Sequence, residues 1–309
     1  LLLVEPPFYR LYKESYGLCK VPLGLAHLAV AARDWAGAEV LVCNADFHPE
    51  PEPFAASYLA GEGYAALRRA LESGEHPGFD AVAAAAARFQ PDVVGITVRT
   101  PALAAARLAA QRTREAAPGA LLLAGGPHAS VAGAELLRCP EFDAAVPGEG
   151  EATLVALLQA MTLDGPLEDV PRPPGLPGLP GLADVPGVLW RREERVLATP
   201  ARAPIVDLDV LPFPGSLDPA CIVDSEAYPA RSLGYVFSSR GCPRACSYCS
   251  SRGVWGRVVR HRSSASVLAE LERLAARGVT HVHFDDDTFG GTPSRLRALC
   301  RDLEAARHG

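Results

Sequence analysis

The stretch "PDVVGITVRTPALAAARLAAQRTREAAPGALLLAGGPH", residues 91–128, holds two short apolar runs on either side of an Ala-rich segment. The runs at 91–98 and 120–128 are continuously apolar, which is typical of strands buried on both faces of a parallel sheet. The segment between them predicts a helix that ends at Pro118-Gly119. A strand, a helix and a second strand in this order predict a right-handed parallel crossover.

The same alternation continues on both sides of this unit. Residues 1–7 and "AEVLVCNADF" predict strands, and a helix is predicted between Pro22 and Gly37. "FDAAVPGEGE" predicts a last strand, followed by a last helix. We therefore predict a doubly wound, five-stranded α/β domain, flavodoxin-like or Rossmann-like, over residues 1–165. A Pro/Gly-rich linker is expected over 166–230, with a small hairpin in "VLWRREERVLATP" and an extended connector in "VDLDVLPFPG".

Residues 231–309 predict a second unit made of two strand-helix repeats. "GYVFSSRG" and "VTHVHFDDDTFG" predict the strands, and residues 264–278 and the segment after Pro293 predict the helices. A parallel sheet made of only two such repeats would keep an unpaired edge. We therefore expect this unit to be incomplete and the chain to be a truncated part of a longer protein.

Composition excludes several classes of function. The net charge of −6 and the lack of a Lys/Arg-rich run argue against a nucleic-acid partner. No apolar stretch approaches the ~20 residues of a membrane span, and the apolar start has no basic segment before it, so we expect neither a membrane anchor nor a signal peptide. A cytoplasmic location is expected. The eight cysteines of such a chain do not predict a disulfide framework.

Three of these cysteines form a cluster in "GCPRACSYCS", residues 241–250. Cys242, Cys246 and Cys249 have the spacing C-x3-C-x2-C, directly after a predicted strand. Structural zinc would need a fourth ligand, for which His261 is a candidate, and three unrelated surface cysteines are a further alternative. A cubane iron–sulfur cluster fits better, because three thiolates leave one iron open for a substrate or cofactor.

The cysteine loop resembles the signature of the radical S-adenosylmethionine (SAM) superfamily. Cys242, Cys246, Tyr248 and Cys249 match its C-x3-C-x-aromatic-C pattern. The resemblance implies a [4Fe-4S] cluster on the three cysteines and SAM on the open iron, near Tyr248. It also implies reductive cleavage of SAM to a 5'-deoxyadenosyl radical. The fold implied for residues 231–309 is the start of a (β/α)6 partial TIM barrel.

A second motif of this kind lies in "HFDDDTFG", residues 283–290. Its aromatic and acidic residues are similar to an F-x-D-D-x-F motif found at the second strand end of many radical SAM enzymes. The resemblance implies SAM contacts at Asp286 and Asp287. The alternative is a solvated loop that caps the helix at Pro293.

The first domain resembles the cobalamin-binding domain of class B, or B12-dependent, radical SAM enzymes. The similarity rests on "VEPP", "PLGLAHLA", "PDVVGIT", "LLLAGGPHAS" and "AAVPGEGE", in that order. Open α/β sheets bind ligands beyond the carboxyl ends of their strands. The cobalamin contacts that we therefore expect are Glu5, Pro6, Thr97, Gly125, Gly126, Pro127, His128, Gly148 and Glu149.

Two other motifs of this domain have simpler explanations. "DFHPEP" at 46–51 imitates part of the D-x-H-x-x-G motif of B12 domains, but it lacks the Gly and follows the second strand, so we interpret it as coincidence. "GEGEAT" at 148–153 follows the last strand and lacks a third glycine, which argues against an NAD site. For His128, a loop histidine paired with backbone or water is the alternative to a cobalamin contact.

The function implied by the resemblance is methyl transfer to an unactivated centre of a small-molecule substrate. Cyclisation or rearrangement, as in anaerobic Mg-protoporphyrin ester cyclases, is the alternative within the family. A non-catalytic corrinoid and iron–sulfur protein and a zinc-stabilised binding protein are the alternatives outside it. The cofactors expected are the [4Fe-4S] cluster, SAM and cobalamin, and the expected reductant is a flavodoxin or ferredoxin. We expect the truncated chain alone to be inactive.

Overall fold

The computed structural model describes residues 1–8, 20–47, 62–163, 184–192 and 195–307. Its first part is built on a sheet with the strand order β2-β1-β3-β4-β5-β6-β7, of which β1 to β5 are parallel. These strands are β1 (Leu2–Glu5), β2 (Leu41–Asn44), β3 (Val93–Thr97), β4 (Leu121–Gly125), β5 (Ala144–Ala145), β6 (Leu189–Arg192) and β7 (Arg195–Ala198). The order 2-1-3-4-5 is that of a flavodoxin-like sheet, which confirms the predicted fold class.

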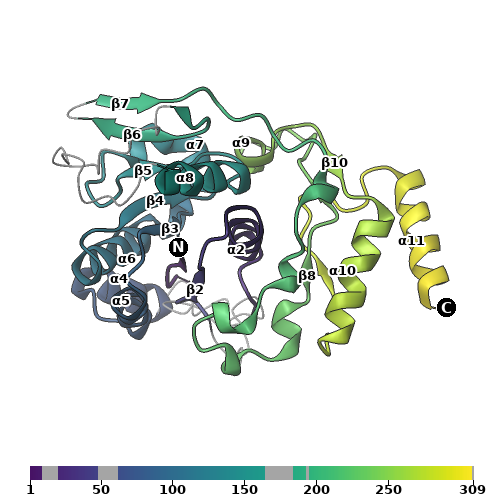
Figure 1. The fold of residues 1–309 in the computed structure, drawn as a ribbon, viewed down its shortest axis with the longest axis horizontal. Helices are drawn as coiled ribbons and strands as arrows, with labels where there is room; N and C mark the ends of the chain where they lie inside the picture. Colours follow the sequence, from purple (N-terminus) through teal and green to yellow (C-terminus); the bar gives the residue numbers. More distant parts are fainter. Residues whose placement is uncertain (9–19, 48–61, 164–183, 193–194, 308–309) are drawn as a thin grey trace.

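Helices cover both faces of this sheet (Figure 1). Successive strand residues point to opposite faces, so Leu2 and Val4 belong to one buried cluster and Leu1 and Leu3 to the other. Helices α5 and α6 pack on the first cluster, and α2 and α8 pack on the second. The helices of this part are α2 (Leu23–Ala36), α4 (Glu62–Ser73), α5 (Pro77–Phe89), α6 (Leu103–Ala116), α7 (Pro127–Leu136) and α8 (Glu151–Leu163).

Helix α2 has the limits that its sequence predicts. It begins directly after Pro22, and Gly37 ends it in a left-handed conformation with φ of 65°. The backbone N–H of Gly37 donates to the carbonyl of Arg33 and that of Ala38 to the carbonyl of Ala32, which satisfies two of the last carbonyls of the helix. The ends of α2 are thus fixed by local chemistry.

The connection to the second part contains the predicted hairpin, but this hairpin belongs to the first sheet. The hairpin β6–β7 pairs antiparallel with β5 and so extends the first sheet. The predicted extended connector after it contains short 3-10 helices at Leu208–Val210 and Pro214–Ser216, the first capped by the Asp207 carboxylate. Residues 164–183 of the Pro/Gly-rich stretch and His48 of "DFHPEP" lie outside the described residues. The domain boundaries stay a prediction.

The second part contains the two predicted strand-helix repeats. Strand β8 runs parallel to β11, and helix α10 lies between them in the chain. Strand β9 turns away from β8 and pairs antiparallel with β10, so the predicted strand 234–241 is split in two. The elements are β8 (Tyr235–Val236), β9 (Ser239–Arg240), α9 (Ser251–Trp255), β10 (Arg260–His261), α10 (Ser264–Ala276), β11 (His283–Phe284) and α11 (Pro293–Arg307).

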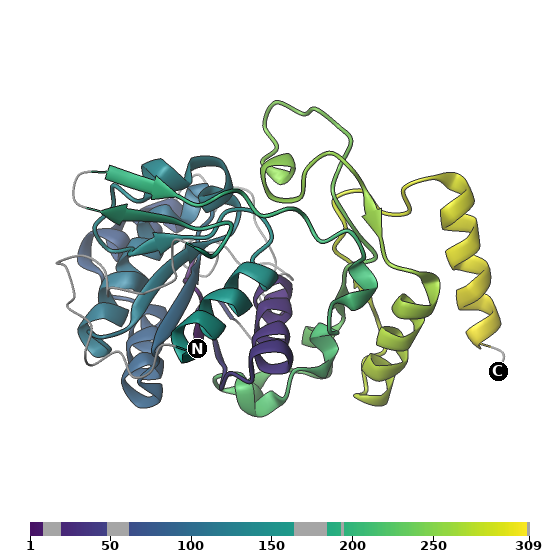
Figure 2. The same cartoon turned by 45° about the horizontal axis from the view of Figure 1, so that its top comes forward.

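The segment with α9 extends from the second part towards the first, as Figure 2 shows. Helix α9 contacts α7 there, with Gly253 packed against Val131. The loop before α9, which carries the cysteines, is therefore held next to the first sheet. Among the described helices, none combines the length and the apolar character that a membrane crossing requires.

Candidate functional site

The three clustered cysteines lie on one loop between β9 and α9. Gly241 opens this loop with φ of 101°, and a Cβ at this position would collide with the carbonyl oxygen of Val258. A larger residue would therefore displace the loop at its first turn. Thr288 Oγ1 donates to Cys242 Sγ at 3.1 Å, and the N–H of Cys249 donates to the carbonyl of Cys246 at 3.2 Å.

The chemistry of this loop fits an iron–sulfur cluster. Cys246 and Cys249 are exposed and Cys242 is half-buried, so all three thiols are within reach of a ligand. Thiolates are the usual ligands of such clusters. In a [4Fe-4S] cluster each cysteine holds a different iron, so the three thiols do not have to surround one common metal position.

His261, the fourth ligand of the zinc alternative, lies apart from this loop. Its ring packs against Gly291, and burial lowers its pKa. A lower pKa keeps the ring neutral. Among the described residues, His261 and the three cysteines do not surround a common metal position, as a closed zinc site would require.

The carboxylate of Asp286 fastens the junction between β8 and β9. It accepts hydrogen bonds from the backbone N–H groups of Ser238 and Ser239, at 2.9 and 2.5 Å, and from their hydroxyls, at 2.7 and 3.0 Å. Burial raises the pKa of Asp286, although these hydrogen bonds act in the opposite direction. Its neighbours are placed differently, because Asp285 pairs with Lys20 at 3.2 Å and Asp287 lines a cavity. The SAM contacts proposed for Asp286 and Asp287 stay a prediction.

Asp286→Ala should destabilise the protein more than Asp286→Asn does. Alanine leaves the N–H groups of Ser238 and Ser239 without their acceptor, at ~1–3 kcal/mol for a buried unsatisfied group, whereas asparagine keeps one acceptor oxygen. Urea unfolding of both variants measures the difference. If Asp286→Asn keeps its stability but loses SAM affinity, the carboxylate contacts SAM as well; equal stability of the two variants would contradict the fastening role.

A cavity of about 520 Å³ lies between the two parts of the chain. This volume is within the ~300–1,000 Å³ range of ligand pockets. It opens at the carboxyl ends of β1, β3 and β4, where an open α/β sheet binds its ligands. The second part contributes Phe237, Arg240, Cys249, Ser250, Ser251, Val254, Trp255, Asp285 and Asp287.

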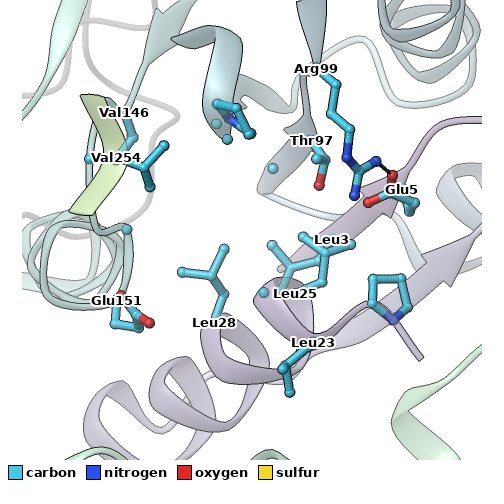
Figure 3. A pocket seen from close by; sticks show the side chains of 18 of the residues that line it. Leu3, Glu5, Leu23, Leu25, Leu28, Thr97, Arg99, Val146, Glu151 and Val254 are labelled. Carbon is cyan, nitrogen blue, oxygen red and sulfur yellow. Dashed lines mark hydrogen bonds and ion pairs between the residues drawn. The ribbon is translucent and has the colours of Figure 1, made fainter. Parts of the chain in front are cut away.

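Apolar and charged side chains line the cavity (Figure 3). Leu3 of β1 and Leu23, Leu25 and Leu28 of α2 form its apolar side. Glu5 and Arg99 lie together next to Leu3 and form an ion pair. Burial lowers the pKa of Arg99. The arrangement suits a large ligand with an apolar face and polar groups at its rim.

Most of the residues predicted to contact cobalamin converge on this cavity. It is lined by Glu5, Thr97, Gly125, Gly126, Pro127 and Gly148, but not by Pro6, His128 or Glu149. His128 Nδ1 is 3.0 Å from Thr100 Oγ1, and Glu149 forms ion pairs with Arg240 and Arg260. Tyr248 is 89% exposed, although Cys249 next to it lines the cavity. The contacts themselves stay a prediction.

Several residues of the cavity carry no motif that would identify them. The leucines of α2 have the spacing of any buried helix face, and Trp255 follows the cysteine loop without a known pattern. Lys20 and Arg240 reach the cavity only through the packing of the two parts. In the sequence, these two residues are marked only by a charge next to an apolar run, which is a weak indication of a binding site.

Comparison with known proteins agrees with this geometry. The B12 binding domain family matches residues 9–158. An uncharacterized methyltransferase of Pyrococcus horikoshii is 29% identical over 313 residues, which cover 100% of this chain and 57% of the relative. Residues 9–158 thus match a B12 binding domain, and the similarity to the methyltransferase extends over the rest of the chain.

Other similar proteins include a cyclase and a methyltransferase of known structure. An anaerobic magnesium-protoporphyrin IX monomethyl ester cyclase of Cereibacter sphaeroides is 31% identical over 192 residues, covering 60% of this chain and 28% of the relative. The fold is shared with the radical SAM methyltransferase TsrM from Kitasatospora setae, solved with cobalamin and a [4Fe-4S] cluster bound (TM-score 0.69, 22% identity, 99% of this chain, 52% of that chain). The chain thus spans 57% or less of these relatives' lengths.

Proposed function

We propose that the chain is part of a cobalamin-dependent radical SAM enzyme that transfers methyl groups to an unactivated centre. One observation carries this proposal: a single cavity is lined by Cys249, by Asp287 and by the glycine turn Gly125-Gly126 at the end of β4. The cluster loop and the carboxyl edge of a B12-type sheet thus face the same space. Two cofactors that must react with one substrate need such a shared space.

The chain's own residues have distinct roles in this proposal. Cys242, Cys246 and Cys249 hold the cluster, and Asp287 faces SAM. The leucines of β1 and α2 accept the apolar face of the corrin ring and keep water away from it. The bound cofactors supply the radical and the methyl group, so the protein has to bind, orient and shield them.

A cyclisation reaction is the second candidate. It is favoured by the cyclase of Cereibacter sphaeroides, whose 31% identity is spread over 192 residues. The methyltransferase of Pyrococcus horikoshii is similar over the whole chain, which favours methyl transfer. The two reactions differ in the fate of the SAM methyl group.

The partners follow from the cofactors. A small-molecule substrate and a flavodoxin or ferredoxin as reductant belong to the proposal, because cleavage of SAM needs one electron. A cytoplasmic location belongs to it too, since a reducing compartment keeps the three cysteine thiols available for iron.

The test is an anaerobic assay of the reconstituted protein with SAM, hydroxocobalamin and dithionite. Methyl transfer predicts S-adenosylhomocysteine together with 5'-deoxyadenosine, whereas cyclisation predicts 5'-deoxyadenosine without S-adenosylhomocysteine. Cobalamin binding with neither product from the full-length protein would point to a non-catalytic carrier and contradict the proposal.

A further inference from the structure

Four buried charged side chains join the first part of the chain to the second. Glu149 and Glu151 come from the loop before α8 and its first residue, Arg240 comes from β9 and Arg260 from β10. Arg240 lies 3.4 Å from Glu149 and 2.5 Å from Glu151, and Arg260 pairs with Glu149. We call these four residues the interdomain ion-pair network.

The network is balanced and almost fully shielded from water. Its side chains are only 2–8% exposed, and two negative charges face two positive ones. A buried ion pair commonly stabilises a fold no better than an apolar contact would, because both charges lose their hydration. What it does supply is a defined geometry, since removal of one partner leaves a charge buried and unpaired.

The two arginines of the network contact the chain before and after the cysteine loop. Arg240 directly precedes Gly241 and Cys242, and its guanidinium lies 4.7 Å from the ring of Trp255, where α9 ends. Arg260 Nη2 donates to the carbonyl of Trp255 at 3.2 Å. The residue before the cysteine loop and the end of the helix after it are thus both attached to Glu149.

The network also forms part of the cavity wall. Glu151 and Arg240 line it, and so does Gly150, which packs against Leu28 of the apolar side. A ligand that fills the cavity therefore touches the residues that hold the cysteine loop. No residue of the network needs to contact iron for this connection to exist.

We infer that the interdomain ion-pair network couples the two cofactor sites, so that cobalamin in the cavity and the cluster on the cysteine loop favour each other's binding. Arg240 and Glu151 are its central positioning residues. The inference rests on the proposed function. It adds that the affinity for one cofactor depends on whether the other is bound. Because coupling between sites is reciprocal, each cofactor raises the affinity for the other by the same factor.

The test is the affinity of the 309-residue chain for hydroxocobalamin, measured before and after anaerobic reconstitution of the cluster. In the wild-type chain, reconstitution should tighten cobalamin binding by at least ~5-fold, the lower end of usual coupling between sites. In Arg240→Gln and in Glu151→Gln the tightening should fall below ~2-fold. The double variant should resemble the single ones, because both substitutions remove the same interaction.

Glu270→Gln is the matched control. Glu270 forms an equally buried ion pair with Arg262 inside the second part, and neither residue lines the cavity. This variant should lose stability but keep the wild-type tightening. Arg240→Lys keeps the charge and should keep part of the tightening of cobalamin binding. This variant replaces Arg240→Gln if Arg240→Gln does not fold.

The outcomes separate the two proposals. A wild-type chain that binds cobalamin equally well with and without the cluster overturns the coupling, as do Arg240 and Glu151 variants with unchanged tightening. In both cases the proposed function stands. A wild-type chain that takes up neither cofactor contradicts the proposed function, and the coupling with it.

Discussion

Cys246→Ala should remove the iron–sulfur cluster from the protein. The thiol of Cys246 is exposed and lies between Cys242 and Cys249 on the loop, so no neighbouring cysteine of the loop is left to replace it. We expect iron and sulfide after anaerobic reconstitution to fall from about four of each per chain to background. In the full-length protein, cleavage of SAM should fall below detection with the same substitution, because no site is left that can deliver the electron.

Cys300→Ala is the control for this substitution. Cys300 is also an exposed, free cysteine, but it lies on α11 and not on the cysteine loop. The control should keep the full iron content. One zinc and no iron in the wild-type chain, or a full cluster in Cys246→Ala, would refute the assignment of the loop.

Gly125→Phe should strongly weaken cobalamin binding while the fold is kept. Gly125 ends β4 and lines the cavity, and a Cβ added to it meets no atom within 4 Å. Its backbone has no positive φ, so a side chain causes no strain there. The aromatic ring would enter the cavity, and we expect the affinity for hydroxocobalamin to fall by at least ~100-fold, or ~2.7 kcal/mol.

Gly119→Phe is the matched control. Gly119 is exposed in the turn after α6, and a Cβ there also meets nothing within 4 Å. The control should bind cobalamin like the wild-type chain, and circular dichroism should report the same fold for both variants. Unchanged cobalamin affinity in folded Gly125→Phe would place the ligand outside this cavity.

The first sheet could be predicted because each of its signals is local. The apolar runs at 91–98 and 120–128 have the length and continuity of buried strands, and Pro22 and Gly37 mark the ends of α2. The split of strand 234–241 could not be predicted. It depends on Asp286, which accepts from Ser238 and Ser239 across 48 and 47 residues of chain.

In the candidate site, too, local patterns could be predicted from the sequence and long-range contacts could not. The cysteine spacing and the glycine turn at Gly125-Gly126 are local patterns, and Cys249 and both glycines line the cavity. Glu149 was predicted from its loop to contact cobalamin, yet its carboxylate is occupied by Arg240 and Arg260. Those arginines lie 91 and 111 positions further along the chain, so only the packing of the two parts reveals the pairing.

The central claim is that cluster and cobalamin share one cavity, and electron paramagnetic resonance tests it most directly. The measurement is the spectrum of cob(II)alamin bound to the chain with a reduced [4Fe-4S] cluster, compared with the same spectrum in Cys246→Ala. Because Cys249 and Gly125 line the same cavity, we predict a cob(II)alamin signal broadened by spin–spin interaction in the wild-type chain and a narrow one in the variant. Identical narrow spectra, with both cofactors present in the wild-type chain, would contradict the account.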